Sequence, residues 1–172
     1  MTGEAVEDTD KKQFIELIEQ NQGLIHKVCR LYCNSGEDRR DLFQEVLLQL
    51  WRSFGSFRQE SSCSTWIYRV ALNTAISGLR HRKRQPPEKS LWEFDAIANA
   101  VSGNGWIEEE PLRRLHDAIS LLSDVDKALL MLHLDEKSYD EIGSLFGMSS
   151  NRVGVKLHRI KAKLKERLSA HA

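Results

Sequence analysis

The sequence has no apolar run that approaches the roughly 18 residues needed to cross a membrane. Its amino terminus, MTGEAVEDTD, is acidic and has no apolar segment behind a positively charged start, so it lacks the pattern of a secretory signal. We therefore expect no membrane insertion and a cytoplasmic location. With 172 residues, 41% of them hydrophobic, the chain can still build one domain core or two small ones.

Cysteine is scarce: there are three, an odd number in a chain without an export signal, so no disulfide framework is inferred. On a helix, His26, Cys29 and Cys33 share one face and resemble part of a zinc site. No fourth ligand lies nearby in the sequence, and small thiols are also ordinary core residues. We expect no metal and no cofactor, while a redox or metal role for these three residues stays open.

The sequence also lacks the usual signs of an enzyme. No cluster of acids or histidines has metal-binding or acid/base spacing, and no phosphate-binding glycine loop is present. The run Glu108 to Glu110 is a charge run that suits a solvated linker better than a metal site. The chain is therefore not expected to be an enzyme, and a metal-dependent nuclease is the least favoured function.

The formal net charge of the chain is zero at pH 7, but the charged residues are unevenly distributed along it. Residues 1–10 carry four acids and no base, 11–85 carry thirteen Lys/Arg against seven acids, 86–111 carry one against six, and 112–172 carry eleven against eight. Helical spacing of apolar residues in both basic segments predicts an all-α fold with two small domains. We expect an acidic tail (1–10), a helical domain (11–85), an acidic linker (86–111) and a second helical domain (112–172).

The stretch from Thr65 to Arg84, TWIYRVALNTAISGLRHRKR, combines aromatic, amide and cationic residues at helical spacing. Winding it at about 100° per residue places its aliphatic residues on one side as core. A narrow stripe on the other side collects Trp66, Arg69, Asn73, Ser77, Arg80 and Arg84. Bases stack on aromatic faces and arginines neutralise phosphates, so we expect this stripe, its indole outside the core, to bind single-stranded nucleic acid. The alternative is that Trp66 covers the edge of the core and the arginines are merely solvated.

Two helices are predicted before this stretch, over residues 11–32 and about 38–54, separated by Asn34, Ser35 and Gly36. The second has a wide apolar side, and its opposite side gathers Asp41, Gln44, Glu45 and Leu48. An exposed leucine with a polar rim has the composition of a docking face for another protein. The alternative is a leucine that is exposed without any function.

A helix-turn-helix is predicted near the carboxyl terminus. Ser138-Tyr139-Asp140-Glu141 is a capping box that opens a short helix ending at Gly147, and Ser149 or Ser150 caps a final helix. The final helix buries Val153, Leu157, Ile160 and Leu164. In this geometry the amino-terminal part of the second helix reaches base edges in the major groove. The candidate DNA-binding residues there are Ser150, Asn151, Arg152, Val155, Lys156 and Arg159. The alternative is a basic surface helix of a helical bundle.

Three stretches, in this order and separation, resemble the extracytoplasmic-function (ECF) sigma factors of bacterial RNA polymerase. They are DLFQEVLLQLW at 41–51, FRQESSCSTWIYRVALN at 57–73 and SYDEIGSLFGMSSNRVGVKLHR at 138–159. The resemblance covers about 10–85 and 112–170. It implies a transcription initiation factor that binds core RNA polymerase and directs it to promoters.

The resemblance assigns a role to each predicted face. It implies that Asp41, Gln44, Glu45 and Leu48 dock on the clamp helices of the largest polymerase subunit. The segment 61–84 would trap the melted minus-ten strand, with a flipped base held by the loop at 57–64. The helix-turn-helix would read the minus-thirty-five duplex and contact the flap, and an anti-sigma factor is an implied partner.

The chain departs from the family pattern at several positions. Ser77 stands where an Asp is usual, Gly154 and Val155 stand where Lys or Arg and Ser are common, and Arg152 replaces a frequent Thr. Promoter sequence is therefore not transferable from other members. The main alternative function is a helix-turn-helix repressor or response-regulator output domain, which would explain the helix-turn-helix but neither the Asp41–Trp51 face nor the Trp66 stripe.

Overall fold

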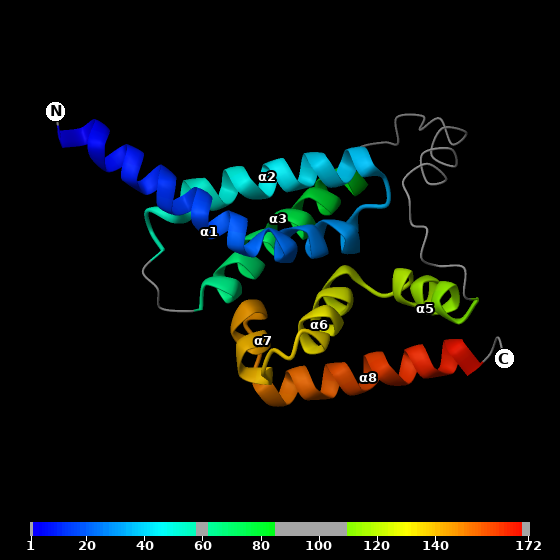
Figure 1. Cartoon of the computed structure of the whole chain (residues 1–172). Coiled ribbons are helices and arrows are strands. Elements are labelled where there is room, and N and C mark those ends of the chain that lie inside the picture. The colour runs from blue at the N-terminus through cyan, green and yellow to red at the C-terminus, as the bar shows by residue number, and fades with distance from the viewer. Residues whose placement is uncertain (1, 58–61, 85–109, 170–172) are drawn as a thin grey trace. The chain divides into compact units, whose positions relative to one another are not determined.

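We describe a computed structural model of the chain, which covers residues 2–57, 62–84 and 110–169; for 2–9, 80–84 and 110–112 it describes the backbone alone. Those residues form seven helices and no strand, as the all-α prediction requires. The chain divides into two compact units, Met1–Lys89 and Ser90–Ala172, each with its own core (Figure 1). None of the helices described is long and apolar enough to cross a bilayer.

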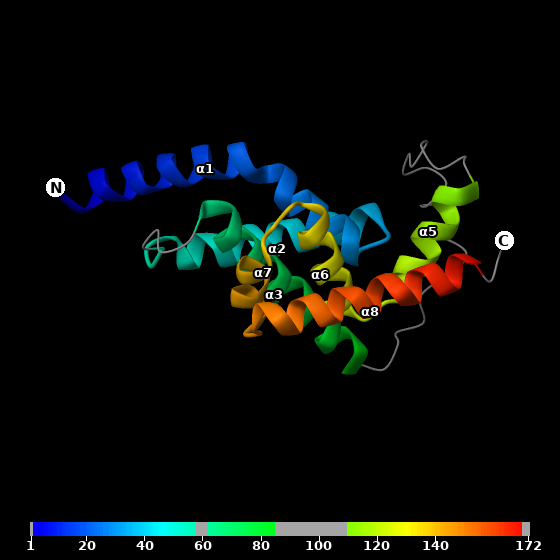
Figure 2. The ribbon, with the colours of Figure 1, turned by 90° about the horizontal axis from the view of Figure 1, so that it is seen from below.

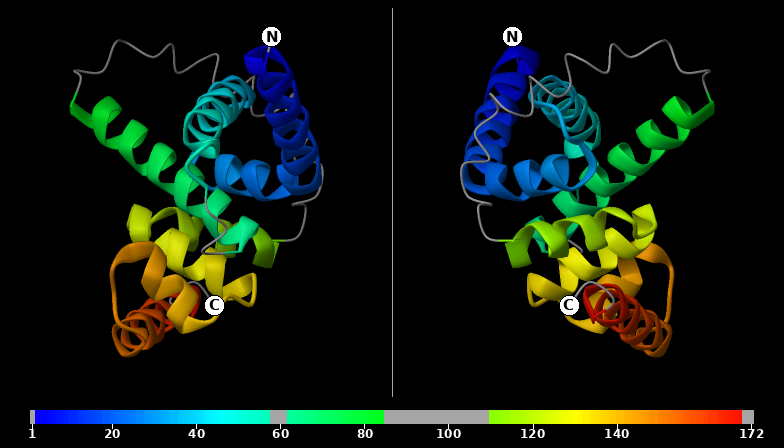
Figure 3. Two further views of the ribbon diagram at one scale, coloured as in Figure 1. Left: turned by 90° about the vertical axis from the view of Figure 1, so that its left-hand side faces the viewer. Right: turned by 90° about the vertical axis from the view of Figure 1, so that its right-hand side faces the viewer.

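The first unit contains three helices: α1 (Thr2–Tyr32), α2 (Gly36–Phe54) and α3 (Cys63–Arg84), each packed against the other two. Helix α1 begins at Thr2, within the segment 1–10 that was expected to be an acidic tail. The ribbon of α1 changes direction part-way along its length (Figure 3). Gly23, an irregularity in the sequence pattern, stays within this helix.

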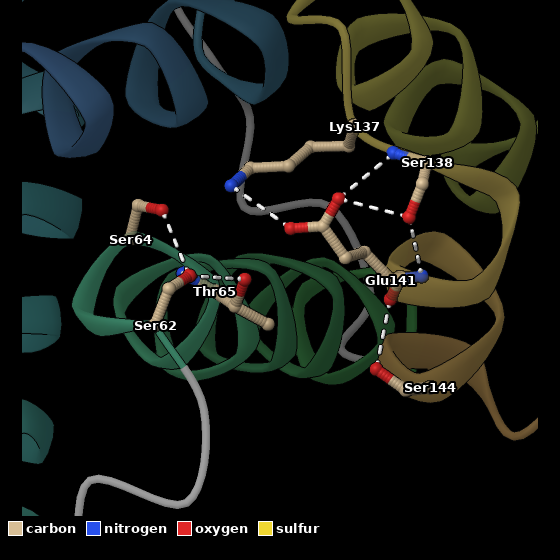
Figure 4. Close-up of polar contacts among 7 residues, drawn as sticks. All are labelled: Ser62, Ser64, Thr65, Lys137, Ser138, Glu141 and Ser144. Atoms are coloured by element: carbon tan, nitrogen blue, oxygen red, sulfur yellow. Dashed lines mark hydrogen bonds and ion pairs between the residues drawn. The ribbon is translucent and has the colours of Figure 1, made fainter.

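Serine side chains fix where the second and third helices begin. The Ser35 hydroxyl accepts a hydrogen bond from the backbone N–H of Asp38 at 3.0 Å, which caps α2. The Ser62 hydroxyl does the same for Thr65 at 3.3 Å, so Ser62 rather than Ser64 caps α3 (Figure 4). The core between the helices is mainly aliphatic, and its fully buried side chains include Ile25, Val28, Val46, Leu50, Ile67, Tyr68 and Leu72.

The second unit contains α5 (Glu110–Ser120), α6 (Asp124–Leu134), α7 (Tyr139–Phe146) and α8 (Ser150–Ser169). Helix α8 packs against each of the other three, and Figure 2 shows it running from α7 towards α5. Helix α5 begins at Glu110, within the segment expected to be linker. Pro111 does not prevent this, because proline fits the first turn of a helix, where its missing N–H has no intrahelical partner.

The helix-turn-helix forms as its caps predict. The Ser138 hydroxyl accepts from the Glu141 backbone N–H at 3.2 Å, and the Glu141 carboxylate accepts from the Ser138 backbone N–H at 2.9 Å (Figure 4). Gly147 ends α7 in the left-handed conformation, at φ 64°, which glycine adopts without steric cost. A Cβ on Gly143 would clash with the carbonyl oxygen of Met148, so glycine is needed for the tight turn before α8.

Candidate polymerase-docking and nucleic-acid interfaces

The predicted docking face on α2 is exposed as expected. Leu42, Val46 and Leu50 are buried, so the side chains opposite them, those of Asp41, Gln44, Glu45 and Leu48, all point to solvent. Leu48 is 42% exposed although it is apolar. A leucine surrounded by two carboxylates and an amide gives this face an apolar centre and an acidic rim.

Three members of the α3 stripe are exposed together: Arg69, Asn73 and Ser77. Asn73 and Ser77 also line a hollow that α3 shares with α2, where Glu45 and Gln49 form part of the wall. The Gln49 side-chain amide donates to the Glu45 carboxylate at 2.7 Å, which orients this wall. The side chains of Arg80 and Arg84 lie outside the described residues, so their place in the stripe stays a prediction.

Trp66 contradicts the expectation that its indole lies outside the core. Only 8% of the residue is exposed, and its ring stacks on Phe57, with centroids 4.6 Å apart and an interplanar angle of 27°. Helical winding separates one buried face from one exposed face, and the start of α3 does not have that simple division. The first turns of α3 are covered on every side, since Thr65, Trp66, Ile67 and Tyr68 are four consecutive buried residues. The alternative, in which Trp66 belongs to the core, describes this residue correctly.

The predicted reading face of α8 is largely exposed. Val153, Leu157, Ile160 and Leu164 are buried as predicted, and Asn151, Arg152, Val155 and Arg159 are exposed on the remaining surface. Ser150 is half-buried, and the helix is capped by Ser149, whose hydroxyl accepts from the Arg152 backbone N–H at 3.3 Å. Lys156 is also half-buried, and its Nζ lies 3.5 Å from an oxygen of Asp126 on α6. This ion pair ties the predicted reading helix to the rest of its unit.

A hollow on the same face includes two residues that sequence reasoning did not assign to DNA. Tyr139, treated only as part of the capping box, is 41% exposed, and His158 is exposed on α8. Both line the hollow together with Gly154 and Val155. The signal that could have revealed Tyr139 is the glycine at 154, since a Cβ there would lie 3.3 Å from Cε2 of Tyr139.

His26, Cys29 and Cys33 do not form one pocket. Cys29 and Cys33 are buried, whereas His26 is exposed and its ring stacks on Phe43 at a centroid distance of 4.4 Å. Burial, followed by the nearby Cys33 thiol, raises the pKa of Cys29 to about 11, so this thiol is protonated at neutral pH. Among the residues whose side chains are described, no group of three or more His, Cys, Asp or Glu could hold a metal ion.

Taken together, the fold and the exposed faces define a helical DNA-binding protein that carries a helix-turn-helix in one unit and a docking face in the other. The Sigma-70 region 2 family model matches residues 17–85, and the Sigma-70, region 4 model matches residues 112–164. The chain is 30% identical, over 169 residues, to the ECF RNA polymerase sigma-E factor of Escherichia coli (strain K12), covering 92% of this chain and 87% of that protein. It belongs to the ECF sigma factors, a family of transcription initiation factors of RNA polymerase.

Other relatives agree with this assignment. The ECF RNA polymerase sigma-E factor of Haemophilus influenzae is 29% identical over 175 residues, covering 96% of this chain and 92% of that one. The solved structure of CnrH in complex with the cytosolic domain of CnrY has a TM-score of 0.65 at 16% identity, covering 94% and 91% of the two chains. The sigma factor RpoE in complex with the anti-sigma factor NepR from Bartonella quintana has a TM-score of 0.64 at 15% identity, covering 92% and 96%. At these identities the two structures support the fold alone.

Proposed function

We propose that the chain binds core RNA polymerase and directs it to specific promoters, with residues 11–85 melting the minus-ten region and residues 112–172 reading the minus-thirty-five duplex. The observation that carries this proposal is the combination on one chain of an acid-rimmed apolar face on α2 and a capped helix-turn-helix in a separate unit. A helix-turn-helix regulator needs only the second of these features.

The α2 face is the proposed contact with the clamp helices of the largest polymerase subunit. Leu48 supplies the apolar centre, and the carboxylates of Asp41 and Glu45 supply a rim that suits a basic partner surface. Opposite charge at a rim speeds association and selects the partner, whereas burial of the central residue contributes most of the affinity. The flap is the proposed contact of the second unit.

The α3 stripe is the proposed binding site for the melted strand. Arg69 offers a cation to phosphate, and Asn73 and Ser77 offer hydrogen bonds to bases or backbone. With Trp66 buried against Phe57, the indole holds the start of α3 in place, and the candidate for a base-stacking surface becomes the half-exposed Phe57. Arg80 and Arg84 extend the proposed site along the helix.

The amino-terminal part of α8 is the proposed reader of the minus-thirty-five duplex. Arg152 and Arg159 suit guanine or phosphate, and Asn151 suits adenine. Lys156 and Ser150, each half-buried, are assigned to the edge of this contact. Holding both units on one polymerase makes the second contact effectively intramolecular, so two weak DNA contacts combine into tight promoter binding.

Two further properties belong to the proposal. The chain acts in the cytoplasm with RNA polymerase and contributes no catalytic chemistry of its own, with no cofactor. A protein partner that sequesters it is proposed from the solved relatives, since RpoE was solved with an anti-sigma factor and CnrH with the cytosolic domain of CnrY.

Run-off transcription tests the proposal most directly. Purified core polymerase is incubated with fragmented genomic DNA, with and without the protein, and new transcripts are mapped. Discrete start sites at a fixed distance from a shared two-block motif support the proposal and give the promoter.

Co-purification with core polymerase is measured in parallel for the wild type and for Leu48→Asp. Val155→Asp is the matched control, because Val155 is a similarly exposed apolar residue of α8. Retention of Leu48→Asp on the polymerase would refute the docking face, and absence of any polymerase binding would favour a regulator that acts alone.

A further inference from the structure

Gly154 lies in a hollow on the predicted reading face of α8. Tyr139, Gly154 and Val155 are among the residues that line this hollow. Tyr139 is 41% exposed and Val155 is 46% exposed, so both present apolar carbon to whatever α8 contacts. A Cβ at position 154 would lie 3.3 Å from Cε2 of Tyr139, so the absence of a side chain there lets the ring lie close against α8.

The position of Tyr139 is fixed by the local structure. It is the first residue of α7, immediately after Ser138, whose capping box with Glu141 sets the start of that helix. Its ring lies 6.0 Å from the ring of His133 on α6 and against Gly154 on α8. Three helices therefore hold this ring, and the hollow is present before any DNA binds.

The apolar lining of the hollow suits an apolar group on the edge of a DNA base. In the major groove the thymine 5-methyl group is the apolar feature that a base presents, and it is read by apolar side chains. The ring face of Tyr139 and the methyl groups of Val155 offer no hydrogen bond to a phosphate, although the Tyr139 hydroxyl can donate one. The surrounding side chains of Asn151, His158 and Arg159 offer hydrogen bonds to neighbouring base edges or phosphates.

We propose that the Tyr139–Gly154–Val155 hollow is a specificity-determining site that takes the 5-methyl group of one thymine in the upstream promoter block. The inference rests on the proposed promoter function and extends it. Tyr139, which lies outside the recognition helix, then becomes a determinant of base preference. A glycine in the middle of a helix lowers helix stability, and leaving room for the Tyr139 ring is the role that the inference gives to Gly154.

The test uses the promoter found by run-off transcription and the full-length protein assembled with core polymerase. Each thymine of the upstream block is replaced in turn by deoxyuridine, which removes only the methyl group, and relative affinity is measured by competition. One replacement should weaken binding roughly fourfold, as expected for loss of one buried methyl group, and the others should change it little. In Tyr139→Ala the same replacement should have almost no effect.

Gly154→Ala provides a second variant that does not threaten folding. Alanine favours the helix, but its Cβ would press on the Tyr139 ring from 3.3 Å, so the penalty for deoxyuridine should shrink. Gly78→Ala on α3 is the matched control, because no atom lies within 4 Å of the added carbon, and it should leave the penalty unchanged. The inference is overturned if no deoxyuridine replacement in the upstream block weakens binding. It is also overturned if the loss of affinity on replacement persists in both Tyr139→Ala and Gly154→Ala. Failure to find a promoter refutes the proposed function and the inference with it.

Discussion

Replacing Trp66 by alanine should destabilise the whole first unit rather than selectively weaken DNA melting. The indole is 92% buried, since 8% of the residue is exposed, and its ring stacks on Phe57 at 4.6 Å. Truncating a buried aromatic side chain to alanine costs about 3–5 kcal/mol in free energy of unfolding. The stacked pair with Phe57 accounts for roughly 0.5–1.5 kcal/mol of such a loss. Because a domain is stable by only about 5–15 kcal/mol, the variant should lose a large part of the stability of this unit.

Urea denaturation of the full-length protein, followed by circular dichroism, measures this loss. The two units have separate cores, so the transition of the first unit should move to lower urea while that of the second stays in place. Trp66→Phe keeps a ring against Phe57 and should cost less than Trp66→Ala, because it leaves a smaller cavity. Val155→Ala is the control for an exposed apolar residue and should change stability by about 0.5 kcal/mol at most.

The functional consequence separates Trp66 from the exposed residues of its helix. Trp66→Ala should weaken polymerase binding and open-complex formation together, because the docking face belongs to the same destabilised unit. Asn73→Ala, at an exposed position, should retain polymerase binding and reduce permanganate reactivity of promoter thymines. A Trp66→Ala protein of wild-type stability that binds polymerase but fails to melt DNA would refute this reasoning and restore direct stacking of the indole on a base.

Three further outcomes are expected from the second unit. Gly143→Ala should lower the stability of the second unit by about 1–3 kcal/mol, because the added Cβ meets the backbone of the following turn. Gly78→Ala in α3 is the control and should be neutral or stabilising. Thermal unfolding compares the two variants. Hydrogen bonds from the Ser138 backbone N–H and hydroxyl lower the pKa of Glu141. Its ionised carboxylate therefore stabilises the fold at neutral pH, and this stabilisation is lost as the pH falls through the lowered pKa. In Glu141→Gln the free energy of unfolding should depend less on pH in the acid range. Arg152→Ala should shift minus-thirty-five preference in a randomised-promoter selection, and an unchanged preference would exclude it as a base reader.

The elements that sequence reasoning located well are those with local signals. The capping box at Ser138 and Glu141 and the glycine at 147 act within one helical turn, so they specify helix ends without knowledge of the tertiary fold. The buried stripe of α8 also follows from spacing alone, since one side of a helix against a core repeats every three or four residues. The exposure of Leu48 is predictable for the same reason.

The elements that it misplaced depend on neighbours distant in sequence. Periodicity assigns Trp66 to the polar side of α3, but Phe57, from before the helix, covers it. The start of α1 at Thr2 was missed because the first ten residues carry four acids and no base, a composition that reads as a solvated tail.

Gly154 shows how a departure from a family pattern gains meaning only in three dimensions. In the sequence it is a glycine in a helix where the family commonly has a lysine or arginine, and helix propensity makes it a cost of about 1 kcal/mol relative to alanine. In the structure the missing side chain leaves room for the Tyr139 ring from another helix. A lysine or arginine at position 154 would add a hydrogen-bond donor and cover the Tyr139 ring. Glycine at this position therefore removes a polar contact and exposes an apolar one. Base preference in this protein should therefore favour thymine at the position that meets this ring, which the deoxyuridine replacements measure.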